Sequence, residues 1–207
     1  MGRMIDQLLD FSRARLGVGI PVVARSCDLL PLIKQTIDEV DAAHPEGTIR
    51  LEHEGDLAGC WELDRLAQVF TNLLANALQH GLVEHGVRVR VNGSSRATVS
   101  VEVWNMGVIP AELLPTRLFE PLAGGRGPQS GSRGLGLGLF IAREIVAAHG
   151  GTIRVSSIET AGTTFTVELP RVVLQKSRGS PAQSRGVARP FEAPGEPERV
   201  AAVESHA

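Results

Sequence analysis

The stretch Gly134-Leu135-Gly136-Leu137-Gly138-Leu139 leads into an apolar run, Phe140 to His149, which predicts a helix. Three glycines at alternate positions remove Cβ atoms from a turn, so several backbone N–H groups can converge on one anion. The helix that follows adds free N–H donors and the positive end of its dipole at the same point. The stretch therefore predicts a phosphate-binding turn.

Two common phosphate-binding motifs do not fit this turn. A P-loop requires G-x-x-x-x-G-K-[ST], and no Lys follows these glycines. A Rossmann turn requires a strand directly before it and a glycine where this chain has Leu139. A glycine-rich lid that leads into a helix is a third type. A plain connector that closes a helix against a sheet is the structural alternative.

A second pattern lies in the segment 63–81, LDRLAQVFTNLLANALQHG. Its apolar residues recur at helical spacing and form one stripe: Leu66, Val69, Phe70, Leu73, Leu74 and Ala77. Asn72, Asn76 and His80 recur every four residues along another face, so their side chains lie one above the other. Asn carbonyl oxygens are neutral, hard ligands that suit Mg²⁺ beside a triphosphate. Alternatively, the two Asn side chains hydrogen-bond a neighbouring loop.

Between these two patterns lies a predicted strand, 98–103, followed by the segment WNMGVIP at 104–110. Pro110 is expected to open a short helix at 111–114. The Asn105 amide carries an acceptor and a donor, which can meet the exocyclic amine and a ring nitrogen of adenine. Gly107 permits close backbone approach or a positive φ. An ordinary strand-to-helix turn explains the same residues without a ligand.

Taken in order, these segments resemble the catalytic ATP-binding domain of bacterial sensor histidine kinases, within the gyrase, Hsp90, histidine kinase and MutL ATPase superfamily. Residues 72–77 resemble the N box, and Asn105 with Gly107 resembles the G1 box. Residues 118–121 (LFEP) resemble the F box, and 134–139 resemble the G2 box. Residues 162–170 (GTTFTVELP) look like the closing strand, so the resemblance runs from about residue 1 to 171.

The resemblance implies an α+β fold, the two-layer α/β sandwich called the Bergerat ATP-binding fold, with a mixed sheet covered on one face by helices. It implies ATP and Mg²⁺ as ligands, with Asn76 as the Mg²⁺-binding residue and Asn105 as the reader of the adenine amine. The ATP-binding residues that it implies are Asn72, Asn76, His80, Asn105, Gly107, Ile109, Phe119, Gly134, Leu135, Gly136, Leu137, Gly138 and Thr163. The function implied is phosphoryl transfer to a histidine by a protein-histidine kinase of a two-component system.

Several positions depart from the family pattern. Position 105 is usually Asp, and the G1 segment is one residue short and lacks a second glycine. Gln79 stands where many kinases carry a basic residue near the phosphates, and the F box ends in Leu122 rather than Phe. These departures favour an alternative function, a non-catalytic nucleotide-binding or interaction module that pairs with another kinase. A serine kinase of the anti-sigma type shares the ATP fold, but the N-terminal segment argues against it.

That N-terminal segment predicts an amphipathic helix from Met1 to Leu16, because Met1, Met4, Leu8 and Phe11 follow a heptad seam. The string LLDFSRARLG at 8–17 resembles the end of the second helix of a histidine kinase dimerisation domain. The resemblance implies that residues 1–17 end this phosphoacceptor hairpin and can form a homodimer. A surface helix that folds back on the domain is the alternative.

The six histidines, at 44, 53, 80, 85, 149 and 206, do not lie in an H-E-x-x-T-P-like context. The phosphoacceptor histidine is therefore expected outside this chain, and the implied partners are a phosphoacceptor domain and a response regulator. His149 precedes Gly150-Gly151 at a predicted helix end, where a cation would suit the helix dipole.

Composition agrees with this interpretation. The 207 residues carry a formal charge of −2 and no long basic face, which argues against nucleic acid as a partner. No apolar run approaches the roughly 20 residues that span a bilayer, so we expect no membrane segment and a cytoplasmic location. We expect the ATP-binding domain at 18–173 and a disordered tail at 174–207, which is rich in Pro, Gly, Ser, Arg, Glu and Ala. Further expected elements are strands at 22–25, 49–54, 57–61 and 87–92, a helix at 29–42, and a hairpin of 152–157 with 163–169.

Overall fold

The structure is a computed structural model that describes residues 2–113, 117–121 and 136–172. Its α-helices are α1 (Gly2–Arg15), α2 (Leu29–Ala43), α3 (Leu63–His80) and α4 (Gly138–Ala148). Three short 3-10 helices are η1 (Val83–His85), η2 (Ala111–Leu113) and η3 (Arg117–Phe119). The strands are β1 (Arg25–Asp28), β2 (Ile49–Gly55), β3 (Ala58–Trp61), β4 (Val87–Gly93), β5 (Thr98–Asn105), β6 (Thr152–Ile158) and β7 (Gly162–Pro170). The predicted tail, 174–207, lies outside the described residues.

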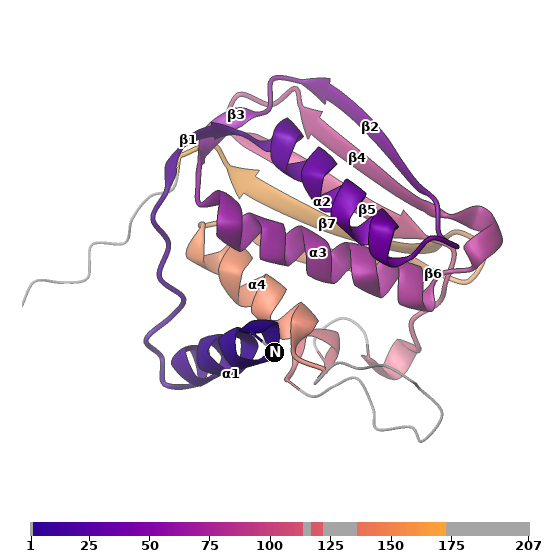
Figure 1. Ribbon diagram of the computed structural model, residues 1–207, viewed down its shortest axis with the longest axis horizontal. Coiled ribbons are helices and arrows are strands. Elements are labelled where there is room, and N and C mark those ends of the chain that lie inside the picture. The colour runs from indigo at the N-terminus through magenta and orange to yellow at the C-terminus, as the bar shows by residue number, and fades with distance from the viewer. Residues whose placement is uncertain (1, 114–116, 122–135, 173–207) are drawn as a thin grey trace, which may run out of the picture. The chain divides into compact units, whose positions relative to one another are not determined.

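Five strands form a mixed sheet in the order β2-β4-β5-β7-β6, and β1 pairs with β3 in a separate two-stranded sheet. The β2–β4 pair is parallel, whereas the other neighbours in the larger sheet are antiparallel. Helices α2, α3 and α4 lie across one face of the five-stranded sheet (Figure 1). The expected α+β sandwich, with a mixed sheet covered on one face by helices, is confirmed.

Strand alternation and the helical stripe together build the core between these two layers. Every second residue of β4, β5 and β7 is buried, as the period of two in a strand requires when one face is covered. All six apolar residues of the predicted α3 stripe are at most 2% exposed. Burying one such large side chain stabilises the fold by about 1.5–3 kcal/mol, so this interface fixes α3 on the sheet.

The structure refines the bounds or the type of two predicted elements. The first strand begins at Arg25 instead of Val22, because it pairs with β3 in the register Arg25↔Trp61. The backbone N–H of Val23 donates instead to Glu62 Oε2 at 2.6 Å. After Pro110 the expected short helix is the 3-10 helix η2 at Ala111–Leu113, with the N–H of Leu113 donating to the Pro110 carbonyl. Position 114 lies outside the described residues.

Helix α1 packs on the domain through an aromatic contact and a set of hydrogen bonds at Asp10. The Phe11 and Phe140 rings meet edge to face with centroids 5.7 Å apart, which joins α1 to α4. Arg65 Nη1 on α3 donates to Asp10 Oδ2 at 2.7 Å, and the Asp10 side chain is only 4% exposed. This packing agrees with a helix that folds back on the domain, while pairing of two chains through residues 1–17 stays a prediction. Within the described ranges, no helix has the length and apolar character needed to cross a membrane.

Candidate nucleotide-binding site

The described half of the glycine turn is joined directly to the Asn-bearing helix. Gly136 has φ +66°, a left-handed conformation that favours glycine, and Leu137 is 2% exposed in the core. Gly138 begins α4, and its carbonyl accepts a hydrogen bond from Asn72 Nδ2 at 3.1 Å. Gly134 and Leu135 lie outside the described residues. The contact fixes the N-terminus of α4, with its free N–H donors, against the middle of α3.

The predicted polar face of α3 divides into three environments. Asn72 is half-buried and uses its amide nitrogen for the Gly138 carbonyl, which leaves its side-chain oxygen as an acceptor. Asn76, one turn further along, is also half-buried. His80 is exposed at the end of the helix, where desolvation by its surroundings still lowers its pKa below the ordinary value. Asn72 therefore lies where α3 contacts the start of α4, Asn76 lies one turn further along the helix, and His80 is its last residue.

Asn105 lies at the last position of β5, where it is 2% exposed and pairs in register with Thr163 of β7. Two glycines make room for its amide. A Cβ built on Gly81 would lie 3.3 Å from Asn105 Nδ2, and one on Gly107 would lie 2.7 Å from it. The Gly107 Cβ would also meet the His80 carbonyl oxygen at 2.3 Å. Gly107 is therefore required for close packing of this loop against the end of α3.

Two hydroxyl groups hold the loop after Asn105 in a closed set of hydrogen bonds. Thr163 Oγ1 donates to the Gly107 carbonyl at 2.7 Å, and the Ile109 N–H donates to Ser157 Oγ at 2.9 Å. The two hydroxyl oxygens lie 2.8 Å apart. Because the Thr163 proton is already committed to Gly107, the Ser157 hydroxyl must donate to Thr163. Four residues from two segments thus fix the backbone on both sides of Val108.

Ser157 is a residue of this site that the sequence prediction missed. It pairs in register with Thr163 across the β6–β7 hairpin. A hairpin that closes over 158–162 places positions 157 and 163 opposite each other, so the predicted hairpin contained the information needed to find it.

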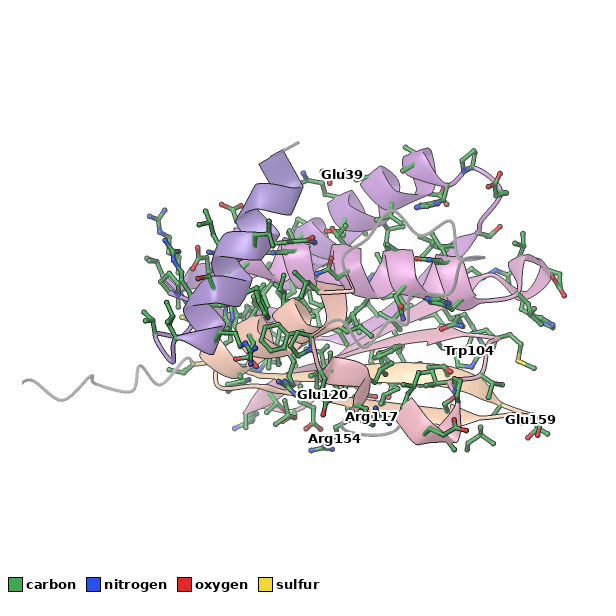
Figure 2. All side chains as sticks on the ribbon, turned by 90° about the horizontal axis from the view of Figure 1, so that it is seen from below. Glu39, Trp104, Arg117, Glu120, Arg154 and Glu159 are labelled. Carbon is green, nitrogen blue, oxygen red and sulfur yellow. The ribbon has the colours of Figure 1, made fainter. Side chains whose placement is uncertain are left out.

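Trp104 anchors the β6–β7 turn behind Asn105. Its indole N–H donates to the Ala161 carbonyl at 2.7 Å, and the Arg88 guanidinium lies 3.8 Å from the ring centroid. Trp104 and Glu159, which is in that turn, lie toward the same end of the sheet in Figure 2. A Cβ on Gly162 would lie 2.5 Å from the Asn105 carbonyl oxygen, so this glycine allows the turn to approach. These contacts therefore fix the end of β5, which carries Asn105, against the β6–β7 turn.

Phe119 has a packing role in the structure. It is 5% exposed, and its ring meets Phe165 edge to face with centroids 6.4 Å apart. A nucleotide contact at Phe119 stays a prediction. A groove of about 700 Å³ between α1, α2 and α3 shares only Asn72 with the predicted ATP-binding residues.

The expectation of a cationic His149 at the end of α4 is wrong. His149 is fully buried; its Nε2 accepts from the Glu62 N–H at 3.2 Å, so its Nδ1–H must donate to the Ile145 carbonyl at 2.8 Å. Burial lowers the pKa of His149, which keeps the ring neutral. The residue therefore joins α4 to the start of α3 as a neutral hydrogen-bonding group.

The fold and these contacts define a layered α/β domain in which a glycine turn and the start of α4 meet the Asn-bearing helix α3, and a polar amide lies at the end of β5. Residues 62–173 match the model of the family described as "Histidine kinase-, DNA gyrase B-, and HSP90-like ATPase". The chain belongs to this family.

The known proteins that this chain resembles agree with this family assignment. The bacteriophytochrome of Pseudomonas aeruginosa is 35% identical over 182 residues, which cover 87% of this chain and 24% of that protein. The sensor protein VanS of Enterococcus faecium is 34% identical over 173 residues, which cover 81% and 44%. The solved catalytic domain of the histidine kinase ThkA is 27% identical with a TM-score of 0.59, over 73% of this chain and 99% of that domain. The chain thus carries the ATP-binding domain of sensor histidine kinases, and it spans less than half the length of both sequence relatives.

Proposed function

We propose that this chain is the ATP-binding catalytic core of a two-component sensor histidine kinase, and that it presents the γ-phosphate of Mg-ATP to a phosphoacceptor histidine outside its own sequence. The observation that best supports this function is the hydrogen bond from Asn72 Nδ2 to the Gly138 carbonyl. It brings the polar face of α3 to the helix N-terminus where the glycine turn ends, and free N–H groups at such a terminus attract phosphate.

The two ends of the nucleotide would meet different chemistry. The adenine would lie against Asn105, whose amide pairs with the exocyclic amine and a ring nitrogen. The loop of Gly107 and Ile109, held by Thr163, would line the same end. The phosphates would lie against Gly136, Leu137 and Gly138 with their backbone N–H groups. The contacts of His80, Phe119, Gly134 and Leu135 with ATP are part of this proposal.

The donor set around Asn76 fits Mg²⁺ when the nucleotide supplies most of the ligands. Within residues 2–113, 117–121 and 136–172, no three His, Cys, Asp or Glu side chains gather in a cluster that could hold a metal. The half-buried Asn76 amide can add one neutral oxygen ligand, and the triphosphate carries the charge. When bound, the metal would neutralise charge on the β- and γ-phosphates.

The reaction would transfer the γ-phosphoryl group from ATP to an imidazole nitrogen and release ADP. The new P–N bond forms as the bond to the β-phosphate oxygen breaks, with the attacking and leaving atoms in line. The residues of this chain would act by positioning and by electrostatic stabilisation, since backbone donors at the start of α4 face the charge that develops on the phosphates. A response regulator would then take the phosphoryl group.

One observation favours the second candidate, a nucleotide-binding or interaction module without kinase activity. The G1 segment has only Val108 between Gly107 and Ile109, and the hydroxyl pair ties both flanking residues to the sheet. A loop held in this way could bind nucleotide without the rearrangements that turnover requires.

Calorimetric titration with ATP, with and without Mg²⁺, tests nucleotide binding and the metal role together. We expect Mg²⁺ to tighten ATP binding, and Asn76→Ala to remove most of this gain because it deletes one metal ligand. Asn92→Ala is the control, since it removes an amide from β4 that donates to Glu54 and accepts from the Ser94 N–H. Absence of any heat with ATP from a folded sample contradicts the proposed function.

Labelling with γ-phosphate-labelled ATP tests where the phosphoryl group goes. We expect no acid-labile phosphohistidine on the isolated chain, because none of its six histidines has the phosphoacceptor context. Label should appear on a phosphoacceptor hairpin from a related sensor kinase added in trans. Nucleotide binding without any such transfer would support the non-catalytic module instead.

A further inference from the structure

We infer that Asn105 relaxes the purine specificity of this site, so that nucleotides with a guanine-type edge bind nearly as well as ATP. The inference rests on the proposed function, because it concerns how the same site reads its base. It follows from three features. The Ser157 and Thr163 hydroxyl protons are already used in hydrogen bonds within the protein, the Asn105 amide has no hydrogen-bond partner among the described residues, and the two kinds of purine edge differ in their donors and acceptors.

The hydroxyl groups beside Asn105 cannot donate a proton to a base. Thr163 donates to the Gly107 carbonyl, and Ser157 must then donate to Thr163 while accepting from the Ile109 N–H. Each hydroxyl has one proton, so both are used within the protein. Thr163 keeps at most one lone pair for a ligand. Of these three side chains, only Asn105 can both donate to and accept from a purine.

The protein does not fix which way the Asn105 amide points. None of the hydrogen bonds found among the described residues uses its side-chain oxygen or nitrogen, although the residue is only 2% exposed. No fully buried side-chain polar atom in this part of the chain lacks a partner, so the amide must still reach open space. The nearby Gly81 and Gly107 offer it no side-chain partner. The two amide orientations, which are almost identical in shape, are therefore both available.

The backbone of Asn105, in contrast, is held firmly. Its carbonyl accepts the Gly107 N–H at 3.1 Å, and it pairs with Val87 and Thr163 in the sheet register. Reorientation is therefore confined to rotation of the amide group. It would not need any movement of β5.

The two purine edges require opposite amide orientations. Adenine presents an amine donor beside a ring acceptor, whereas guanine and hypoxanthine present a carbonyl acceptor beside a ring N–H donor. An amide matches the first edge in one orientation and the second after a half-turn. A carboxylate only accepts, so Asp at position 105 would oppose one acceptor on either edge, the ring nitrogen of adenine or the carbonyl oxygen of the guanine type. Asn at this position can match both edges.

Calorimetry with the magnesium complexes of ATP, ITP and GTP tests this inference. ITP carries the guanine-type edge without the 2-amino group, so it separates edge recognition from a steric clash at that group. We expect the wild-type chain to bind ITP within about tenfold of ATP. Asn105→Asp should weaken the binding of both ATP and ITP by about tenfold or more, because the carboxylate opposes one acceptor on either purine edge.

Asn92→Asp is the matched control, since it makes the same amide-to-carboxylate change on β4 and should leave the affinities for ATP and ITP unchanged. A wild-type preference for ATP over ITP above about a hundredfold would overturn the inference, as would unchanged affinities for both nucleotides in folded Asn105→Asp. If burial of the new carboxylate prevents folding of that variant, the wild-type ratio decides alone. Absence of binding by all three nucleotides would instead refute the proposed function.

Discussion

Substitution of Ser157 by Ala should release the Ile109 side of the G1 loop from the sheet, while Thr163 still holds Gly107. The change deletes the acceptor of the Ile109 N–H and the donor to Thr163 Oγ1, at 2.9 Å and 2.8 Å. A net hydrogen bond contributes about 0.5–1.5 kcal/mol, and a partly buried group left unpaired costs about 1–3 kcal/mol. Water can reach this half-buried position in part, so we expect the free energy of unfolding to fall by about 1–3 kcal/mol.

Ser156→Ala provides the control for this substitution. Ser156 is the neighbouring residue on β6 and is exposed on the opposite face, so its loss should change stability by less than about 0.5 kcal/mol. Urea denaturation followed by circular dichroism measures both variants, and calorimetry measures their ATP affinity. We expect Ser157→Ala to bind ATP more weakly, because the Ile109 side of the loop beside Asn105 is no longer held before binding. Equal stability and equal ATP affinity of the two variants would refute the positioning role of Ser157.

Two further predictions concern contacts away from the base. Burial lowers the pKa of His149, so below about pH 6.5 the unfolded chain takes up a proton that the folded chain excludes, and stability should fall as the pH decreases toward the folded-state pKa. His149→Gln should lose this part of the pH dependence, as urea midpoints between pH 5 and 8 can test, and parallel pH profiles of the two proteins would contradict it. Asp10→Ala should release α1, because it removes the partner of Arg65 at 2.7 Å. Hydrogen exchange should then accelerate in α1 but not in α3, and equal protection of α1 in both proteins would count against this contact.

The spacing of apolar residues along the chain was enough to predict the positions of the main helices and strands. The apolar stripe from Leu66 to Ala77 predicts both the helix and its buried face, because helical period and burial are set by the same spacing. The alternation of β4 and β5 is equally direct. Val22 and Val23 misled the prediction of the first strand, since an apolar pair is consistent with several structures. The position of the strand was decided by its pairing with β3, in which Arg25 lies opposite Trp61, more than 30 residues away in the sequence.

The sequence by itself determined the fold class and predicted the chemistry of the candidate site, because the order and spacing of Asn72, Asn76, Asn105 and the glycine turn are local properties of the chain. The tertiary structure decided how these groups are held. Only the folded chain shows that His149 stays neutral, since its burial and its bond to Glu62 depend on packing of α4 against the start of α3.

Arg171 is another residue whose hydrogen-bond partners could not be predicted from the sequence. Its guanidinium donates to the carbonyl oxygens of Asp56, between β2 and β3, and of Gly93 and Ser95, at the connection of β4 to β5. The role of the Ser157 and Thr163 hydroxyl groups likewise depends on the loop that they bond, at Gly107 and Ile109. Spacing along the chain specifies which groups share a face, whereas the direction of each proton depends on partners that only folding brings within hydrogen-bonding distance.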